Sequence, residues 1–338
     1  MAELRRDPII GQWVLVEDDQ HSLKPEDYER EDQTRTKAAV CQFCAGREDQ
    51  TPPEVDAIRN DGSAPDTPGW SARVVPNRFP ALRIEGELEK RGLGIYDTSN
   101  GIGAHEILIE TKDHERDLAD LGVDEIADVL KLYQRRSINL AKDKRFKYIM
   151  VFKNYGKSAG ASVEHAHSQI IALPMVPRSV LVELEGSRNY FGFRGRCVYC
   201  DIIQQEQADR DRLVSENEFF TAFCPYVACY PFASWILPKE HEANFCTLSD
   251  EARPHLAAIL KEMLKRMQTC LSDCSYNFYL HTAPLQYKDG ENFHWHIEIV
   301  PQITRESGYE WGTGFYSVRT SPAVAAGYLR EAQVEAYV

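Results

Sequence analysis

The chain has 338 residues, of which 43% are hydrophobic, enough for a sizeable core in two domains or one fused pair. Its formal net charge of −13 argues against non-specific nucleic-acid binding, because a phosphate backbone needs a cationic partner. The opening residues lack the apolar stretch of a secretory signal and no window reaches the length of a membrane span, so we expect a cytoplasmic protein without membrane contact.

The first half of the chain opens on a polar region and then predicts a mixed set of elements. Residues 17–68 are rich in Asp, Glu, Pro and Thr and are expected to be mostly irregular, with 51–68 a surface loop. Apolar and polar residues then alternate as in strands, and one longer segment has helical spacing. We expect strands at 72–76, 105–110 and 148–152, a helix within 117–142, and a further strand carrying His165, His167 and Gln169.

The second half repeats this order of elements. Strands are predicted at 219–223 and 234–238, a helix at 250–271, and strands at 276–281 and 293–300. Residues 321–333 are predicted to form a terminal helix. The connector, 177–195, has several large apolar residues, which favours packing over flexibility. The sequence therefore predicts an α+β fold built from a duplicated module, with antiparallel sheets and helices packed on them, divided into residues 1–176 and 177–338.

A pattern of cysteines and histidines recurs in both halves at similar spacing. Each copy has Cys-x-x-Cys, a lone His, and then His-x-His on an apolar strand. The proposed ligands are Cys41, Cys44, His114 and His165 in site 1, and Cys197, Cys200, His241 and His294 in site 2. Both sets suit tetrahedral zinc, so we expect two zinc ions per chain with a structural role. The other reading of Cys197 and Cys200 is a pair of buried thiols, and the remaining cysteines are expected to be ordinary thiols.

His167 is not needed as a metal ligand once His165 is assigned to site 1. Residues two apart on a strand share a face, so one imidazole can bind metal while its neighbour stays available. The alternative is an ordinary core histidine. However, the preceding loop, 154–162, is rich in small residues and can bring backbone N–H groups against a phosphate. A neutral histidine beside such a loop is a candidate nucleophile at phosphorus.

The run from Phe152 to Gln169 resembles the active-site signature of the galactose-1-phosphate uridylyltransferases, a branch of the histidine-triad superfamily. The resemblance extends along the chain, through Arg5 to Val14, the Cys41 and Cys44 pair, Val75 to Pro80, Asp113-His114, and Gly308 to Glu310. It implies a duplicated histidine-triad-like module, a homodimer, and a role in carbohydrate (galactose) metabolism.

The resemblance also implies roles for individual residues. His167 would be the nucleophile that takes a nucleoside monophosphate from a nucleotide sugar in a ping-pong reaction, helped by Gln169 and Ser162. Nucleotide or phosphate contacts are expected from Asn77, Phe79, Asn154, Gly160, Ala161, Ser162 and Gln169. In the second copy, Glu298 replaces the glutamine and would repel a phosphate. His281 and His296 are competing ligands for the second metal, which could then be iron, although two thiolates favour zinc.

Three classes of function are consistent with these residues. The first is a nucleotidylyltransferase, with UDP-glucose:hexose-1-phosphate (galactose-1-phosphate) uridylyl transfer favoured by a small margin. The second is a nucleotide hydrolase, which Gln169 disfavours because an amide cannot shuttle a proton to water. The third is a zinc-stapled nucleotide-binding or scaffold protein without transferase activity. The expected partners are a nucleotide sugar and a sugar 1-phosphate.

Three departures from the uridylyltransferase pattern concern the choice of substrate. Ala166 stands where the family has proline between the histidines, Lys153 replaces a glutamate, and Glu17-Asp-Asp-Gln-His21 replaces a basic loop. These changes resemble a sister branch of ADP-glucose phosphorylases, which pass AMP to inorganic phosphate. The base and the acceptor therefore stay open, whereas the nucleotidyl-histidine step is common to both branches.

Overall fold

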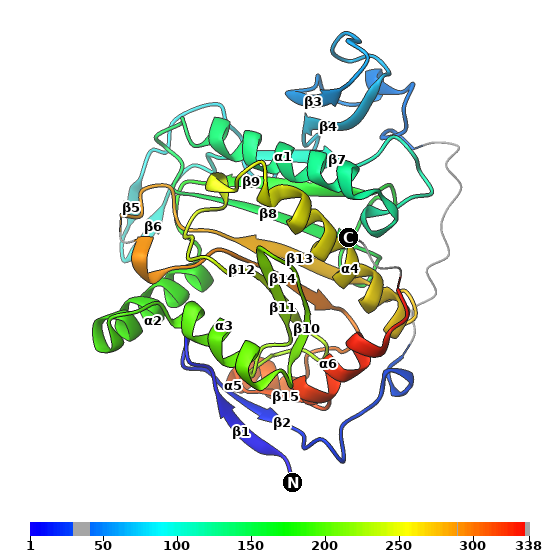
Figure 1. Cartoon of the computed structure of the whole chain (residues 1–338). Helices are drawn as coiled ribbons and strands as arrows, with labels where there is room; N and C mark the ends of the chain where they lie inside the picture. The colour runs from blue at the N-terminus through cyan, green and yellow to red at the C-terminus, as the bar shows by residue number, and fades with distance from the viewer. Residues whose placement is uncertain (30–40, 289, 335–338) are drawn as a thin grey trace.

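The computed structural model describes residues 1–29, 41–288 and 290–334, and its centre is a ten-stranded antiparallel sheet (Figure 1). The strand order is β10-β11-β12-β14-β13-β8-β9-β7-β4-β3. The strands of the first half are β3 (Asp56–Arg59), β4 (Trp70–Pro76), β7 (Ala104–Ile109), β8 (Tyr148–Tyr155) and β9 (His167–Leu173). Those of the second half are β10 (Leu213–Glu216), β11 (Phe220–Phe223), β12 (Ser234–Pro238), β13 (Tyr276–His281) and β14 (His296–Pro301).

The two halves of this sheet have the same strand order and meet at equivalent strands. From the centre outwards, the first half runs β8-β9-β7-β4-β3 and the second runs β13-β14-β12-β11-β10. The join is the antiparallel pair β8 and β13, in which Asn154 lies opposite Asn277. The internal repeat in the sequence therefore appears as two half-sheets joined edge to edge into one continuous sheet.

Two long helices cover one face of the sheet. Helix α1 (Val123–Leu140) and helix α4 (Ala252–Cys270) contact each other above the central strands (Figure 1). Their apolar residues, such as Ile126, Leu130, Leu256 and Leu260, are buried in the main core. Because apolar residues recur at helical spacing, each helix turns a continuous stripe towards the sheet. Helix α6 (Pro322–Glu331) packs against α4 and completes this layer.

The other face of the sheet is only partly covered. Helix α2 (Arg178–Arg194) and helix α3 (Val198–Asp209) pack over its second half, where Val180, Leu184 and Val198 join a second buried cluster. At the other end, Phe43 and Trp70 form a small separate cluster beside the first cysteine pair. The part of this face between the two clusters carries His167, which is buried, and Gln169, which is half-buried. We call this part the open face.

The remaining elements lie at the periphery of the sheet. Strands β1 (Glu3–Arg6), β2 (Trp13–Val16) and β15 (Tyr316–Val318) form a three-stranded sheet, and β5 (Arg91–Leu93) pairs with β6 (Tyr96–Thr98). The short helix α5 (Gly308–Thr313) precedes β15. Among the helices of the described chain, none combines the length and apolarity that crossing a membrane requires.

The predicted α+β class with antiparallel strands is confirmed, and the differences are local. The expected surface loop 51–68 contains strand β3, and residues 30–40 of the polar region lie outside the described residues. The expected connector 177–195 is helix α2, which begins after Pro177 and ends at Gly195 in a left-handed conformation. His165 precedes β9 rather than lying on it, so only His167 and Gln169 share the predicted row of side chains.

Candidate active site

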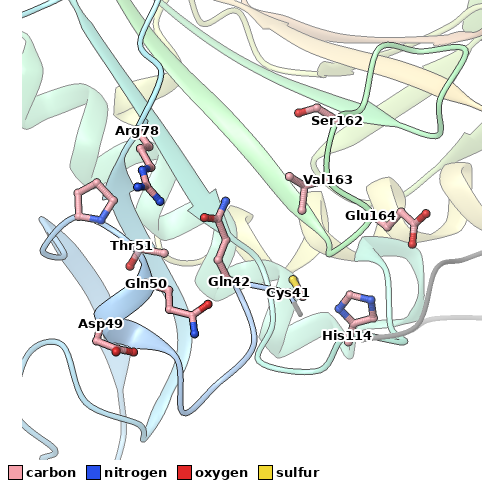
Figure 2. Close-up of a pocket in the computed structure, with 11 residues that line it drawn as sticks. Cys41, Gln42, Asp49, Gln50, Thr51, Arg78, His114, Ser162, Val163 and Glu164 are labelled. Atoms are coloured by element: carbon pink, nitrogen blue, oxygen red, sulfur yellow. The ribbon is translucent and has the colours of Figure 1, made fainter. Parts of the chain in front are cut away.

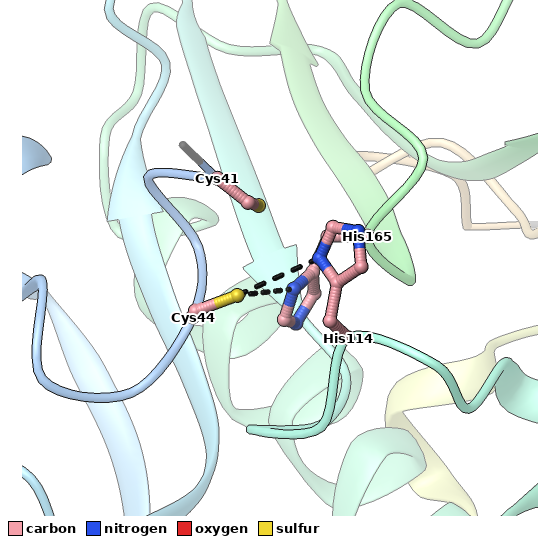
Figure 3. A group of neighbouring side chains, drawn as sticks. All are labelled: Cys41, Cys44, His114 and His165. Carbon is pink, nitrogen blue, oxygen red and sulfur yellow. Dashed lines mark hydrogen bonds between the residues drawn. The ribbon is translucent and has the colours of Figure 1, made fainter. Parts of the chain in front are cut away.

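The four side chains of site 1 converge at the edge of the open face (Figure 3). Their ligand atoms all lie within 4.8 Å of one another. Cys44 Sγ is 3.5 Å from His114 Nδ1 and 3.7 Å from His165 Nδ1. In the cysteine turn, the Phe43 backbone N–H donates to Cys41 Sγ at 3.4 Å, which holds the two thiols on the same side. Two thiols and two imidazole nitrogens are the donor set that tetrahedral zinc prefers.

The hydrogen bonds behind His165 fix its orientation for metal binding. Its Nε2 atom donates to the Thr111 carbonyl oxygen at 2.7 Å, so the lone pair of the neutral ring is on Nδ1, facing the thiols. In metal-bound histidines, the ring nitrogen that does not bind the metal usually donates such a hydrogen bond. Burial lowers the pKa of His165, which favours the neutral, ligating form. The geometry therefore fits a metal ion held by these four residues.

Site 2 has the same construction in the second half. Cys197 and Cys200 lie at the start of α3, one helical turn apart, and Cys200 Sγ is 3.3 Å from His241 Nδ1 and 3.7 Å from His294 Nδ1. Both histidines donate from Nε2 to backbone carbonyls at 2.9 Å, those of Gly290 and Pro238 respectively. The expected donor set is thus assembled with Nδ1 as the ligating atom of each histidine.

The structure places His281 and His296, the competing ligands, in a third group of side chains. Glu183, His281, His296 and Glu298 have ligand atoms within 4.8 Å of one another, and none of them is a cysteine. His281 Nδ1 is 2.9 Å from a Glu183 oxygen, and His296 Nε2 is 3.3 Å from a Glu298 oxygen. The charge of Glu183 outweighs the effect of burial and raises the pKa of His281 to about 9. The two histidines are therefore bound to carboxylates rather than to the Cys197 and Cys200 pair.

His167 lies on β9 next to site 1 but takes no part in the metal group. Its Nδ1 atom donates to the His165 carbonyl oxygen at 2.8 Å, which leaves the lone pair of the neutral ring on Nε2. Burial lowers the pKa of His167 to about 4, so the imidazole is neutral near pH 7. Phe43 packs against the ring in an edge-to-face arrangement. A neutral, orientated imidazole with one unprotonated nitrogen can act as a nucleophile.

Gln169 is held by a residue that the sequence did not single out. The Ala81 backbone N–H donates to His105 Nδ1 at 3.1 Å, so the proton of the neutral ring is on Nε2. That proton is donated to Gln169 Oε1 at 2.8 Å. Because its oxygen is occupied, the hydrogen-bonding capacity that Gln169 offers a ligand is the donating –NH2 end. An amide donor two residues from His167, on the same face of the strand, suits an anionic group.

The loop between β8 and β9 has the tight turns expected for its small residues. Gly160 has a φ of +84°, a conformation that glycine adopts without strain. In this conformation the backbone N–H groups of Gly160 and Ala161 donate within the loop, to the Lys157 and Gly156 carbonyls. Their part in binding phosphate stays a prediction, and the side chains of Asn154 and Ser162 are the more available donors.

A pocket of about 860 Å³ adjoins site 1 and this loop (Figure 2). Ser162 and Val163 line it from the loop, and Arg78 lines it from the segment after β4. Two of the expected nucleotide contacts, Asn77 and Phe79, follow β4. The Asn77 side-chain oxygen accepts a hydrogen bond from the Phe79 backbone N–H. Phe79 itself is 84% exposed. The pocket can hold a nucleotide-sized ligand, and the guanidinium of Arg78 supplies positive charge in a chain that is negative overall.

Lys153, one of the unusual residues, lies on the far side of the sheet from the pocket. It is buried and contacts Glu110 at 2.7 Å and Asp117 at 3.0 Å. Ser168 donates to Glu110 and also hydrogen bonds with Tyr133 of α1. The charges of Asp117 and Glu110 outweigh burial and raise the pKa of Lys153, which keeps it an ammonium. We call these five residues the buried ion network; it supports β9 directly behind His167.

The sequence missed His105 and this network for different reasons. His105 occupies a polar position of an alternating strand, where one histidine carries no motif of its own. The charged members of the network come from three separate segments, and nothing in the sequence shows that they meet. The register with β9, in which His105 lies opposite Ile171, places His105 on the same face as Gln169, and the sequence carries no signal for that register.

Comparisons with known proteins agree with this geometry. The N-terminal domain of galactose-1-phosphate uridyl transferase matches residues 1–177, and the C-terminal domain matches residues 183–308. An ADP-glucose phosphorylase from Arabidopsis thaliana is 35% identical, over 97% of this chain and 92% of its own. A galactose-1-phosphate uridylyltransferase from Thermotoga maritima is 26% identical, over 99% and 100%.

Solved structures show the same relationship. The crystal structure of an Arabidopsis thaliana ADP-glucose phosphorylase with bound ADP-glucose has a TM-score of 0.83 at 34% identity and covers 99% of this chain and 100% of its own. A uridylyltransferase structure has a TM-score of 0.76 at 28% identity, with 98% of each chain covered. The chain therefore belongs to the galactose-1-phosphate uridyl transferase family.

Proposed function

We propose that the protein transfers a nucleotidyl group from a nucleotide sugar through a covalent nucleotidyl-histidine at His167. The observation that carries this proposal is the state of His167, whose Nδ1 is fixed by the His165 carbonyl while Nε2 keeps its lone pair. In the first step Nε2 attacks the α-phosphorus, a P–N bond forms, and the P–O bond to the departing sugar phosphate breaks. In the second step an acceptor oxygen attacks phosphorus and the P–N bond breaks, which restores the histidine.

The surrounding donors are proposed to stabilise charge on the phosphate. The transferring group carries negative charge throughout, so catalysis depends on position and on preorganised donors. Gln169 offers its amide nitrogen because His105 occupies its oxygen. Asn154, near the end of β8, and Ser162, in the loop that follows, are the other proposed side-chain donors. Since an amide cannot accept and release a proton as an imidazole can, we expect transfer to a phosphate acceptor rather than hydrolysis.

The base and the acceptor define two candidate reactions. UDP-glucose:hexose-1-phosphate uridylyl transfer is the reaction that the full-length signature favours. ADP-glucose phosphorolysis, the second candidate, is supported by the 35% identity to the Arabidopsis phosphorylase, against 26% for the Thermotoga uridylyltransferase at similar coverage. We therefore propose that ADP-glucose with inorganic phosphate be tested first, and UDP-glucose with galactose 1-phosphate beside it. The larger specificity constant identifies the natural pair.

The covalent step is tested by weighing the intact protein after incubation with each nucleotide sugar. The wild type should gain the mass of AMP or UMP under mildly alkaline conditions, and the gain names the base. His167→Gly should gain no mass while keeping its fold and metal content. A wild type that gains nothing with either donor would contradict the proposal and favour a binding protein without transferase activity.

Both cysteine–histidine groups are proposed to hold zinc with a structural role. Each supplies four ligands and leaves no open coordination position for a substrate. Zinc, when bound, would fix the turn that carries His165 and the start of α3. Elemental analysis should return about two zinc ions per chain, and iron in place of one of them would contradict this assignment.

The remaining expectations rest on the family resemblance and on composition. We propose a cytoplasmic homodimer that acts on a nucleotide sugar and a sugar 1-phosphate in carbohydrate metabolism. Light scattering of the purified protein tests the oligomeric state, because a dimer should have twice the mass of the 38.6 kDa chain.

A further inference from the structure

A side chain of the second half, Asn277, hydrogen bonds to the loop between β8 and β9. Asn277 lies on β13, directly opposite Asn154 in the β8 and β13 pair. Its Nδ2 atom donates to Asn154 Oδ1 at 2.8 Å and to the Ala159 carbonyl oxygen at 2.9 Å. One amide group of the second half thus contacts both the end of β8 and the middle of the loop that follows it in the first half.

A third hydrogen bond fixes which way the Asn277 amide faces. Gln302, which follows β14, donates from Nε2 to Asn277 Oδ1 at 2.9 Å. With its oxygen accepting from Gln302 and its nitrogen donating twice, Asn277 has a consistent set of partners in only one of its two orientations. The Ala159 carbonyl can only accept, so the Asn277 nitrogen must lie on its side, and Gln302 then donates to the Asn277 oxygen from the other side.

The hydrogen bond from Asn277 determines which end of the Asn154 amide can contact a ligand. Because Asn154 Oδ1 accepts from Asn277, the donating Nδ2 end is the part of the side chain left for a ligand. That nitrogen faces the loop glycine: a Cβ atom built on Gly160 would lie 3.7 Å from it. A phosphate oxygen needs donors, and an Asn154 turned by half a rotation would present an oxygen instead.

We propose that Asn277, orientated by Gln302, is a positioning residue that aims the Asn154 amide donor at the phosphate groups of the substrate. The proposal rests on the proposed nucleotidyl transfer for its catalytic consequence. It parallels the first-half arrangement in which His105 occupies the oxygen of Gln169. In both cases an acceptor oxygen is taken by a neighbour, so that the donor end is presented to the anion.

Two variants separate orientation from shape and charge. Asn277→Asp keeps the shape, but its carboxylate cannot donate, so Asn154 is expected to rotate and donate to it. Asn277→Leu removes the hydrogen bonds without adding charge. Gln134→Ala is the matched control: this glutamine also spans the two halves, donating to the Cys246 and Leu248 carbonyls and accepting from Arg253, but it lies on α1, away from the loop.

The variants are compared in three measurements: kcat and KM for the nucleotide sugar, the single-turnover rate of adduct formation, and the Kd of the matching nucleoside diphosphate by calorimetry. Asn277→Leu should lower the adduct rate or the affinity about 10-fold, and Asn277→Asp should lower it further. Gln134→Ala should match the wild type within about twofold, a change smaller than the loss of one hydrogen bond. In an Asn154→Ala background, Asn277→Leu should have a clearly smaller effect than in the wild type, because the part that acts through Asn154 is already lost.

Several results would overturn this inference. An Asn277→Leu variant equal to the wild type, a loss shared by Gln134→Ala, or an undiminished effect in the Asn154→Ala background would each assign Asn277 a merely structural role. Failure of the proposed function is distinguishable, since it appears as a wild type that forms no adduct. In that event nucleoside diphosphate affinity alone decides the role of Asn277.

Discussion

The two His-x-His strands share a backbone arrangement but differ in the neighbours of the second histidine. In both copies Nδ1 of that histidine donates to the carbonyl of the first, at 2.8 Å for His167 and 3.0 Å for His296. Nε2 of His296 then contacts Glu298, whereas the corresponding residue beside His167 is the neutral Gln169. The residue two positions after the second histidine therefore makes the difference: with Gln169 the His167 imidazole is available to an anion, and with Glu298 the His296 imidazole is bound to a carboxylate.

The contrast continues on the opposite face of the sheet, on the neighbouring strands β8 and β13. The strand registers pair Phe152 with Gln169 and Tyr279 with Glu298, so the next residues, Lys153 and Leu280, are equivalent. Leu280 belongs to the apolar core, while Lys153 belongs to the buried ion network. The second copy shows that the fold does not need charge at this position. The network is thus specific to the copy that carries His167.

The largest expected effect comes from breaking one metal site in each copy. Cys44→Ser and Cys200→Ser should each lose about one zinc ion and destabilise the protein by several kcal/mol, on the order seen when structural zinc is removed. Metal analysis and thermal unfolding measure both losses. Only Cys44→Ser should also lower the activity of the folded fraction, because site 1 holds His165 and, through its carbonyl, His167. Equal activity losses would contradict the division of roles.

Lys153→Leu tests the buried ion network by giving the first copy the residue of the second. The change leaves Glu110 and Asp117 buried without their cation, and should cost about 3–5 kcal/mol of unfolding free energy. Denaturant titration measures this cost. Leu280→Met is the control at the equivalent position, with an expected cost below about 1.5 kcal/mol because it conserves volume. Similar costs for the two variants would show that the network adds no specific stability.

Gln169→Glu makes the open face of the first copy resemble the second. The carboxylate would repel the phosphate and attract a proton onto His167, so kcat should fall about 10²–10³-fold, as for loss of one preorganised donor. Thermal unfolding should change little, because residue 169 is only half-buried. Steady-state kinetics with the preferred nucleotide sugar provide the measurement. If kcat falls by less than about tenfold, Gln169 is not one of the catalytic residues.

The reciprocal change, Glu298→Gln, should have the smallest effect on activity. The carboxylate lies in the third group of side chains, where its hydrogen-bond partners, Tyr279 and His296, belong to the second copy, so turnover should stay within about twofold, less than the contribution of one hydrogen bond. The same kinetic assay applies. A large fall in kcat would mean that the second copy takes part in the reaction.

The sequence predicted most of the fold because its signals are local. Apolar periodicity gave α1 and α4, and the repeated order of elements matches the two half-sheets. It did not predict α2 as a helix, since its apolar residues are spread around the segment rather than gathered on one face. The strand β3 was hidden in a polar region, where a short edge strand has little alternation.

The sequence predicted only those residues of the candidate site that belong to recognisable motifs. The metal ligands stand in Cys-x-x-Cys and His-x-His patterns, and all eight were placed in two groups that the structure brings together. His105 and Asn277 act through single hydrogen bonds to Gln169 and Asn154, and each comes from a distant segment. Such pairs depend on strand register, which the sequence alone does not determine.

The most direct test of the comparison between the two copies is the position of the nucleotidyl group on the labelled protein. After incubation with the donor that gives an adduct, the chain is digested under mildly alkaline conditions and the peptides are sequenced by tandem mass spectrometry. We predict a single labelled residue, His167, with no label on the peptide that contains His294 and His296. A label on His165 or on either second-copy histidine would contradict the assignment of the nucleophile.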